Sequence, residues 1–502
     1  MSSPEEIHIP VSLLDYIPPR NYVRLLFPLA LKPAVEYGVV FRDLQLALHK
    51  TFVQEPWASG KVFRRTNPDV PGQLEIRFLS VYHEEGADQG PRQLRYHELE
   101  TDWSYTELQE SGFPTDAFPD EEQFLFDAPR VGDVDGGGAD IFLAQANFLP
   151  GGLFLAVTTS HAATDAAGML DLVKLWAENF RELHGRDAGG VVAPSPFDAR
   201  DRDRGLPERP WSQGEKEGVQ RRNDGDDPWL RALVSLDSDF PGEFAPGHSA
   251  TASREDGRGR MLNRVLFLSG QDLAALQTEC AAEPLPPGEG ALSASDAVNA
   301  FLWRGLLRAR AAAAEARGAA LADELSVFES PVDVRGLWAP DFPAHYLGNC
   351  FLLNTARLPL ADLIASSTGL GRIARALRSG AGSLDQTAAH AAYGLLRSVG
   401  DVSRVRGRFV ERMDSADLLV SNVMFFSMED LNFGDRYFGN GGVAHRLRVL
   451  HAQYADSVRL AHILPRNPNH GGVELSVNLF EDEMPYLEED EEFNRYVVPI
   501  EV

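Results

Sequence analysis

The sequence predicts a mixed α/β protein with two core units, and three observations lead to this prediction. The chain has 502 residues, of which 44% are hydrophobic and 24% charged, the balance of a folded globular protein. A domain spans roughly 100–200 residues, so a chain of this length has room for more than one hydrophobic core. Short apolar runs and turn residues alternate up to residue 183, and a second patterned series begins at Met261.

The first unit is expected over residues 1–185. Its patterned segments are, in order, a helix at Phe41–Gln54, a strand hairpin made of Ala139–Phe148 and Leu153–Ser160, and an amphipathic helix at Thr164–Leu183. A Leu-Pro-Gly-Gly stretch separates the two strands of the hairpin, as a tight turn requires. His161 therefore falls in the turn between a strand and a helix.

Residues 186–260 contain few apolar residues and many Pro, Gly, Asp and Arg residues, which predicts a long, partly mobile crossover linker. Residues 261–502 are expected to form the second unit. A strand at Met261–Ser269 opens it, and the segments QDLAALQTECAAE and ASDAVNAFLWRGLLRARAAAAEARG have the spacing of helices.

The net charge of the chain restricts the classes of partner. With 47 Lys and Arg residues against 74 Asp and Glu residues, the formal charge is −27, which repels nucleic acids and anionic membrane surfaces. An anionic ligand would need a local cluster of arginines. The two cysteines, Cys280 and Cys350, are too few for a disulfide framework or a metal site. With no leader and no long apolar stretch, we expect a soluble, cytoplasmic monomer that binds no metal.

His161 is the candidate catalytic residue. Among the 13 histidines, it alone is followed four residues later by an aspartate, Asp165. A strand-to-helix turn fixes the backbone of a residue while it exposes the side chain. Asp165 is placed to cap the following helix, which is a structural role. A lone histidine at a strand end is more often structural than functional, so this pattern alone leaves both interpretations open.

Further segments match one family in the correct order. The pattern His161 to Asp165 resembles the HxxxD motif of the BAHD-type acyl-CoA-dependent acyltransferases, in particular their fungal branch, which includes the trichothecene 3-O-acetyltransferases. The matching segments are VSLLDYIPPRNYVRLLFPL near the N-terminus, Leu292–Arg310, Pro331–Trp338, His345–Cys350 and Ser421–Gly434. The sequence departs from the family in two places. Ala166 stands where a glycine is frequent, and the segment Asn432 to Arg436 stands where the family has D-F-G-W-G.

The resemblance implies two chloramphenicol-acetyltransferase-like units, each a mixed sheet flanked by helices, with a channel between them. It implies transfer of an acyl group, expected to be acetyl, from acyl-CoA to a hydroxyl of a hydrophobic secondary metabolite. Acyl-CoA is then a co-substrate, and no cofactor is permanently bound. His161 would be the general base, because an imidazole with a pKa near 6.5 accepts a proton at neutral pH. No G-x-S-x-G motif accompanies His161, which argues against a serine hydrolase.

The resemblance also assigns the supporting residues. Asp165 is expected to point away from His161 and to form an ion pair with Arg335, and Asn432 and Gly434 are expected to support the site structurally. Ser293 and Ser295 are placed on the donor side. Arg372 and Arg375 are expected, from the residues themselves, to bind the phosphates of CoA, because the stretch 372–412 has the local excess of arginine that an anionic ligand requires. Together with Arg378 they fall at spacings of three and share a helix face, although a solvated basic face also explains the pattern.

Two alternatives remain open at this point. A condensation-type transferase would take its acyl group from a carrier protein. Its motif, H-H-x-x-x-D-G, has a second histidine where Ser160 stands here, and this disfavours it. A non-catalytic binding protein on the same scaffold would account for the altered segment Asn432 to Arg436, whereas the presence of His161 argues against it.

Overall fold

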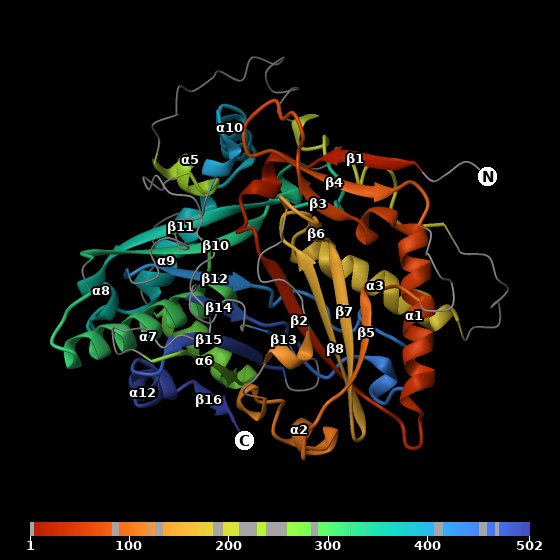
Figure 1. Ribbon diagram of the computed structural model, residues 1–502. Helices are drawn as coiled ribbons and strands as arrows, with labels where there is room; N and C mark the ends of the chain where they lie inside the picture. Colours follow the sequence, from red (N-terminus) through yellow and green to blue (C-terminus); the bar gives the residue numbers. More distant parts are fainter. Residues whose placement is uncertain are drawn as a thin grey trace.

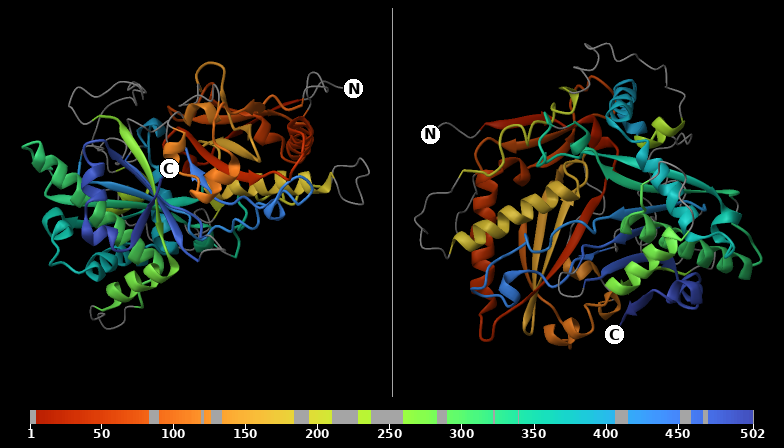
Figure 2. Two further views of the ribbon diagram at one scale, coloured as in Figure 1. Left: turned by 90° about the horizontal axis from the view of Figure 1, so that it is seen from below. Right: turned by 180° about the vertical axis from the view of Figure 1, so that it is seen from behind.

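The computed structural model describes residues 5–82, 90–118, 121–125, 134–183, 194–209, 228–236, 259–282, 290–321, 323–338, 340–405, 415–450, 459–466 and 471–501. These residues form three β-sheets with helices packed against them, so the predicted α/β class is confirmed. Figure 2 shows two bodies side by side, one built mainly from the first third of the chain and one from the second half.

Two sheets belong to the first body (Figure 1). The smaller one has the order β1 (Glu6–Pro10), β4 (Leu74–Leu79), β3 (Lys61–Arg64), β6 (Ala139–Asp140). The larger one has the order β13 (Arg448–Val449), β2 (Tyr22–Ala30), β8 (Gly152–Ser160), β7 (Phe142–Leu149), β5 (Leu94–Glu98). The predicted hairpin is β7 and β8, which pair antiparallel through a two-residue turn, Pro150–Gly151.

Two helices cover one face of the larger sheet: α1 (Tyr37–Gln54) and α3 (Ala166–Glu182) (Figure 2, right). They pack on each other, and the indole Nε1 of Trp176 donates a hydrogen bond of 3.0 Å to the carbonyl oxygen of Leu44. The apolar stripe of α3 is fully buried in this core, as its amphipathic pattern predicts. The observed bounds of both helices lie within a few residues of the predicted ones.

The second body contains a seven-stranded sheet with the order β11 (Phe351–Pro359), β10 (Leu325–Asp333), β12 (Leu418–Asn422), β14 (Leu460–Ile463), β15 (Val473–Phe480), β9 (Met261–Leu268), β16 (Val497–Ile500). A second hydrophobic core joins this sheet to α6 (Gly270–Ala281), α7 (Ala294–Ala316) and α9 (Leu370–Gly382). The remaining helices described are α2 (Tyr105–Glu110), α5 (Pro228–Leu233), α8 (Leu360–Ile364), α10 (Gln386–Arg397), α12 (Met484–Glu488) and α13 (Glu491–Asn494).

The late segment 431–450 returns to the first body. Its strand β13 pairs with β2, and its Arg448 binds Glu474 of β15 through a 2.6 Å ion pair. Both side chains are buried, so this pair joins the two sheets. Residues late in the sequence therefore contribute to the first body. The boundaries 1–185, 186–260 and 261–502 stay a prediction of where each folding unit begins and ends.

Only parts of the expected crossover 186–260 belong to the described residues, namely 194–209, 228–236 and 259–260. Arg204, Leu206 and Leu233 from these parts are buried, so the crossover contributes to the packed structure. The mobility predicted for the rest of the linker concerns residues outside the described ranges. Within the described ranges, no helix has the length and apolarity that crossing a membrane requires.

Candidate active site

His161 lies in the turn between β8 and α3, and its backbone is held on both sides. Its N–H donates to the carbonyl oxygen of Asn21 at 2.9 Å. Its own carbonyl oxygen accepts a 2.8 Å hydrogen bond from the side-chain Nδ2 of Asn349. Asn21 immediately precedes β2, the strand that pairs with β8, whereas Asn349 precedes β11 in the second body. The turn is therefore fixed by both bodies of the molecule.

Asp165 caps α3 and forms the expected ion pair with Arg335. Its backbone is extended (φ −91°, ψ −177°), and its carboxylate accepts from the N–H of Gly168 at 3.1 Å. Nη2 of Arg335 lies 3.0 and 2.9 Å from the two carboxylate oxygens. The backbone N–H of Cys350 donates to Oδ2 at 3.0 Å. These hydrogen bonds hold the carboxylate between Arg335, the N-terminus of α3 and the backbone of Cys350.

Arg335 connects the turn that carries His161 and Asp165 to the segment 346–350. The same Nη2 that binds Asp165 also donates to the carbonyl oxygens of Tyr346, at 2.7 Å, and Gly348, at 3.0 Å. Arg335 is only 5% exposed, so its charge needs these acceptors close by. The guanidinium thus holds the start of α3 and the approach to β11 in one arrangement.

The surroundings of His161 favour a neutral imidazole. Burial lowers the pKa of His161, and the nearby charge of Asp165 opposes this effect without cancelling it. Nδ1 is buried and has no hydrogen-bond partner of standard geometry within the described ranges. The ring of Phe351 lies 6.0 Å from the imidazole, centroid to centroid. A neutral imidazole beside an apolar wall can accept a proton, as a general base must.

The two serines predicted on the donor side lie at the N-terminus of α7 and make different contacts. Ser293 caps α7 and shares the carboxylate of Asp296 with Arg378, whose Nε lies 3.0 Å from it. The hydroxyl of Ser295 instead accepts from Nδ2 of Asn422 at 2.8 Å.

The two predicted phosphate-binding arginines lie on α9. Arg372 pairs with Asp362 at 2.9 Å on the exposed side of this helix, and Arg375 is half-buried. The third arginine of the predicted face, Arg378, pairs with Asp296 in the first turn of α7.

Asn432 and Gly434 lie at the far end of α3, away from His161. The carbonyl oxygen of Asn432 accepts from Arg181 in the last turn of α3, and its Oδ1 accepts from the N–H of Gly434 at 2.7 Å. Gly434 has φ +81°, a conformation that suits glycine. Phe433 between them packs against Trp176 of α3 with ring centroids 6.0 Å apart. Any support that this segment gives to the site passes through the helix.

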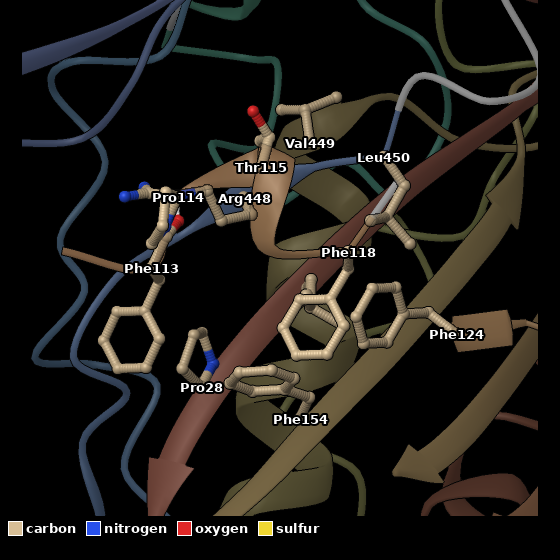
Figure 3. A pocket seen from close by; sticks show the side chains of 11 residues that line it. Pro28, Phe113, Pro114, Thr115, Phe118, Phe124, Phe154, Arg448, Val449 and Leu450 are labelled. Carbon is tan, nitrogen blue, oxygen red and sulfur yellow. Dashed lines mark hydrogen bonds between the residues drawn. The ribbon is translucent and has the colours of Figure 1, made fainter. Parts of the chain in front are cut away.

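A cavity of about 30 Å³ lies on the other face of the larger sheet (Figure 3). Four phenylalanines form its wall: Phe113, Phe118, Phe124 and Phe154. Phe154 precedes Ser160 by six residues on β8, so the cavity is roughly 20 Å along the strand from the histidine turn. A second cavity of about 110 Å³ is lined by residues that include Trp57, Arg202 and Arg204. Neither cavity includes His161.

Two buried residues of the site, Asp15 and Asn349, were not predicted as functional. Asn349 lies within the HYLGNC segment noted in the sequence, and Asp15 within VSLLDY. The spacing of Ser12 and Asp15 is that of a capping box, which was a usable signal for a helix start. Within the described ranges, no group of three or more His, Cys, Asp or Glu residues is arranged to hold a metal ion.

Comparisons with known proteins agree with this architecture. The model of the trichothecene 3-O-acetyltransferase-like N-terminal domain matches residues 22–179, and the model of the Transferase family matches residues 232–494. The crystal structure of TRI101 from F. graminearum with ethyl coenzyme A has the same fold, with a TM-score of 0.72 and 17% identity over 99% of this chain and 100% of that one. The two-unit fold expected from the sequence is thereby confirmed.

The curated relatives differ in size. The chain is 27% identical to the isocyanide synthase-NRPS hybrid crmA of Aspergillus fumigatus over 97% of its own length and 31% of that protein. It is 25% identical to the enoyl-CoA isomerase/hydratase claC of Penicillium crustosum, covering 97% of this chain and 50% of that one. The acyltransferase cm3D of Cordyceps militaris is 24% identical, with 98% and 96% covered. The chain thus spans half or less of the first two relatives and nearly all of the third.

Proposed function

The protein belongs to the Transferase family, in the fungal branch of the BAHD-type acyltransferases, and we propose that it transfers an acyl group from acyl-CoA to a hydroxyl group. The acyl group is acetyl, and the acceptor is a hydrophobic secondary metabolite. Solved TRI101 structures with coenzyme A and with ethyl coenzyme A, and relatives whose names include acyltransferase, support this proposal. Acyl-CoA serves as a co-substrate, so no bound cofactor takes part.

The observation that carries the proposal is the geometry of His161. Its backbone is hydrogen-bonded on both sides, and burial lowers the pKa of its imidazole, so that the ring is neutral at pH 7. The imidazole removes the proton of the acceptor hydroxyl while the oxygen attacks the thioester carbonyl. The resulting tetrahedral intermediate expels the thiolate of CoA. The imidazolium then donates the proton that it took from the hydroxyl to this thiolate. The products are an ester and free CoA, and no acyl-enzyme forms.

The other predicted residues have supporting roles in this proposal. Asp165 and Arg335 hold the turn that carries His161, and Asn432 and Gly434 brace the far end of α3. Ser293, Ser295, Arg372 and Arg375 stay assigned to the donor side, with acyl-CoA in a channel between the two units. Arg378 joins them, because it binds Asp296 beside Ser293 at the N-terminus of α7.

The proposed acceptor class follows the printed names of the relatives. An eremophilane O-acetyltransferase of Penicillium rubens is 25% identical over 90% of this chain, and a TRI101 structure contains T-2 beside coenzyme A. The first name gives an eremophilane, a terpenoid skeleton, as the acceptor of that relative. We therefore propose hydroxylated terpenoids as the first acceptors to be screened, with the cytoplasm as the place of reaction and a monomer as the active form.

The test combines calorimetry with a turnover assay. Acetyl-CoA and CoA are titrated into the unaltered protein and into His161→Ala, and release of free CoA is followed with a panel of hydroxylated acceptors. We expect both proteins to bind acetyl-CoA, and turnover to fall about 10²- to 10⁴-fold in His161→Ala. His8→Ala is the matched control, because His8 lies on β1 and its ring nitrogens lie 3.0 Å from Glu6 and 3.1 Å from Glu75. Absence of acetyl-CoA binding by the unaltered protein would refute the proposal.

A second candidate function keeps the chemistry and changes the donor. The matching relative from Aspergillus fumigatus is a hybrid with an NRPS, and this chain corresponds to 31% of it. In that setting the acyl donor would be a carrier protein. The same turnover assay with an acetylated carrier protein in place of acetyl-CoA distinguishes the two donors, since only the true donor supports transfer at micromolar concentration.

A further inference from the structure

Asp15 is a buried carboxylate that the proposed reaction does not use directly. It lies in the 3-10 helix Leu13–Tyr16 at the start of the chain and is only 1% exposed. Its Oδ2 accepts from the backbone N–H of Ser12 at 2.7 Å, which closes a capping box. The carboxylate of a capping box on a protein surface stays hydrated, whereas this one has been withdrawn from water.

The second oxygen of Asp15 binds Asn349 in two ways. Oδ1 accepts from the backbone N–H of Asn349 at 3.0 Å and from its side-chain Nδ2 at 2.8 Å. The same Nδ2 donates its other hydrogen to the carbonyl oxygen of His161 at 2.8 Å. Because a carboxylate and a carbonyl can only accept, the amide group of Asn349 must turn its NH₂ toward both of them. One carboxylate thus fixes the orientation of the amide that holds His161.

Burial of Asp15 carries a cost in solvation. Burial raises its pKa, and the opposing positive charge is Arg204, whose Nη1 lies 3.6 Å from Oδ1. Arg204 itself is only 6% exposed. An apolar side chain at position 15 would avoid this cost of desolvation, but it could not accept from Asn349. The contribution of the carboxylate therefore lies in the geometry that it imposes.

This hydrogen-bond chain explains how the turn is held at both ends. The end at Asp165 is fixed by Arg335 and by the N–H of Cys350. The end at His161 is fixed by Asn349, the residue next to Cys350. We propose that Asp15 is a positioning residue: through Asn349 it fixes the backbone carbonyl of His161 and so directs the imidazole toward the reacting hydroxyl. The hydrogen-bonded connection from Asp15 through Asn349 to His161 rests on the geometry alone. The statement that the imidazole is directed toward a reacting hydroxyl rests on the proposed function.

The test uses Asp15→Asn and Asn349→Ala in the full chain. Asp385→Asn is the matched control, since Asp385 also caps a helix, α10, through a 2.8 Å bond to the N–H of Ala388. Misdirection of a catalytic group by a fraction of an ångström lowers rates steeply, so we expect kcat to fall about 10- to 100-fold in both variants. KM for acyl-CoA should stay unchanged, because neither side chain is assigned to the donor site. Asp385→Asn should alter neither value.

A second readout is independent of activity. In protein labelled with ¹⁵N-histidine, the imidazole resonances of His161, assigned with His161→Ala, should shift or broaden in Asp15→Asn and Asn349→Ala and stay unchanged in Asp385→Asn. Unchanged resonances and unchanged kcat in a folded Asp15→Asn protein would overturn the inference. If Asp15→Asn does not fold, the imidazole resonances and kcat of Asn349→Ala are used in its place, and unchanged values in that variant would overturn the inference. If the unaltered protein turns over no acyl-CoA, the proposed function fails, and the resonances alone decide the role of Asp15.

Discussion

Replacing Arg335 by methionine should destabilise the protein strongly, and the structure sets the magnitude. Methionine keeps the apolar stem of the side chain and removes the guanidinium, whose Nη2 serves both oxygens of Asp165 and the carbonyl oxygens of Tyr346 and Gly348. Asp165 is 6% exposed and would keep only the N–H groups of Gly168 and Cys350. Breaking a buried ion pair by removing one partner costs about 3–5 kcal/mol.

The assay is a double-mutant cycle measured by urea unfolding, with tryptophan fluorescence and circular dichroism as probes. Arg335→Met, Asp165→Asn and the double variant are compared with the unaltered protein. Because the two side chains bond directly, the loss in the double variant should be smaller than the sum of the single losses by about 1–3 kcal/mol. Arg372→Met is the control, since Arg372 pairs with Asp362 on the surface, where ion pairs contribute little. Single losses that add within about 0.5 kcal/mol would refute the coupling.

Three further predictions follow from burial. Since burial lowers the pKa of His161, kcat/KM should rise with pH and reach its plateau with a midpoint below 6.5, and a midpoint above 6.5 would contradict the assignment of a buried base. Burial lowers the pKa of His462 to about 4, so the unfolded chain takes up a proton at this residue at a higher pH than the folded protein does. The free energy of unfolding should therefore decrease by roughly 3 kcal/mol as the pH falls from 6.5 to 4. Urea midpoints between pH 7 and pH 4 measure this loss, which His462→Gln should reduce. Gly168→Ala should destabilise by about 1–3 kcal/mol although alanine favours helices, because a Cβ there would lie 2.8 Å from the carbonyl oxygen of Leu347. Gly38→Ala in α1, where a Cβ meets nothing within 4 Å, should be neutral or stabilising, and urea unfolding of both glycine variants measures the difference.

Local periodicity predicted the elements around the site well. The helix predicted at Phe41–Gln54 is α1, the predicted hairpin is β7 and β8, and the helix predicted after His161 is α3. Each has a strong apolar pattern within one segment, and tertiary packing uses that same pattern. Asp165 and Arg335, which form the ion pair, are 170 residues apart in the sequence, and only the family resemblance predicted their contact.

Contacts without a local pattern were not predictable. Asp15 and Asn349 are 334 residues apart, and nothing in either neighbourhood specifies the other. Strand β13 has two residues, Arg448 and Val449, which is too short for a period of two to be recognised. Arg378 pairs with Asp296 whereas Arg372 pairs with Asp362, and which carboxylate an arginine of α9 meets depends on where α7 begins.

The position of His161 depends on the register of a strand in the other body. The backbone N–H groups of Asn349 and Cys350 donate to different carboxylates, those of Asp15 and Asp165, at 3.0 Å each. Directly after them β11 begins, and its pairing of Phe351 with Asp333 of β10 sets the register. A shift of β11 by one residue would turn each N–H to the opposite side and detach both carboxylates at once. The turn that carries His161 is therefore coupled to the second body through backbone geometry, and side-chain substitutions at positions 349 and 350 test only part of that coupling.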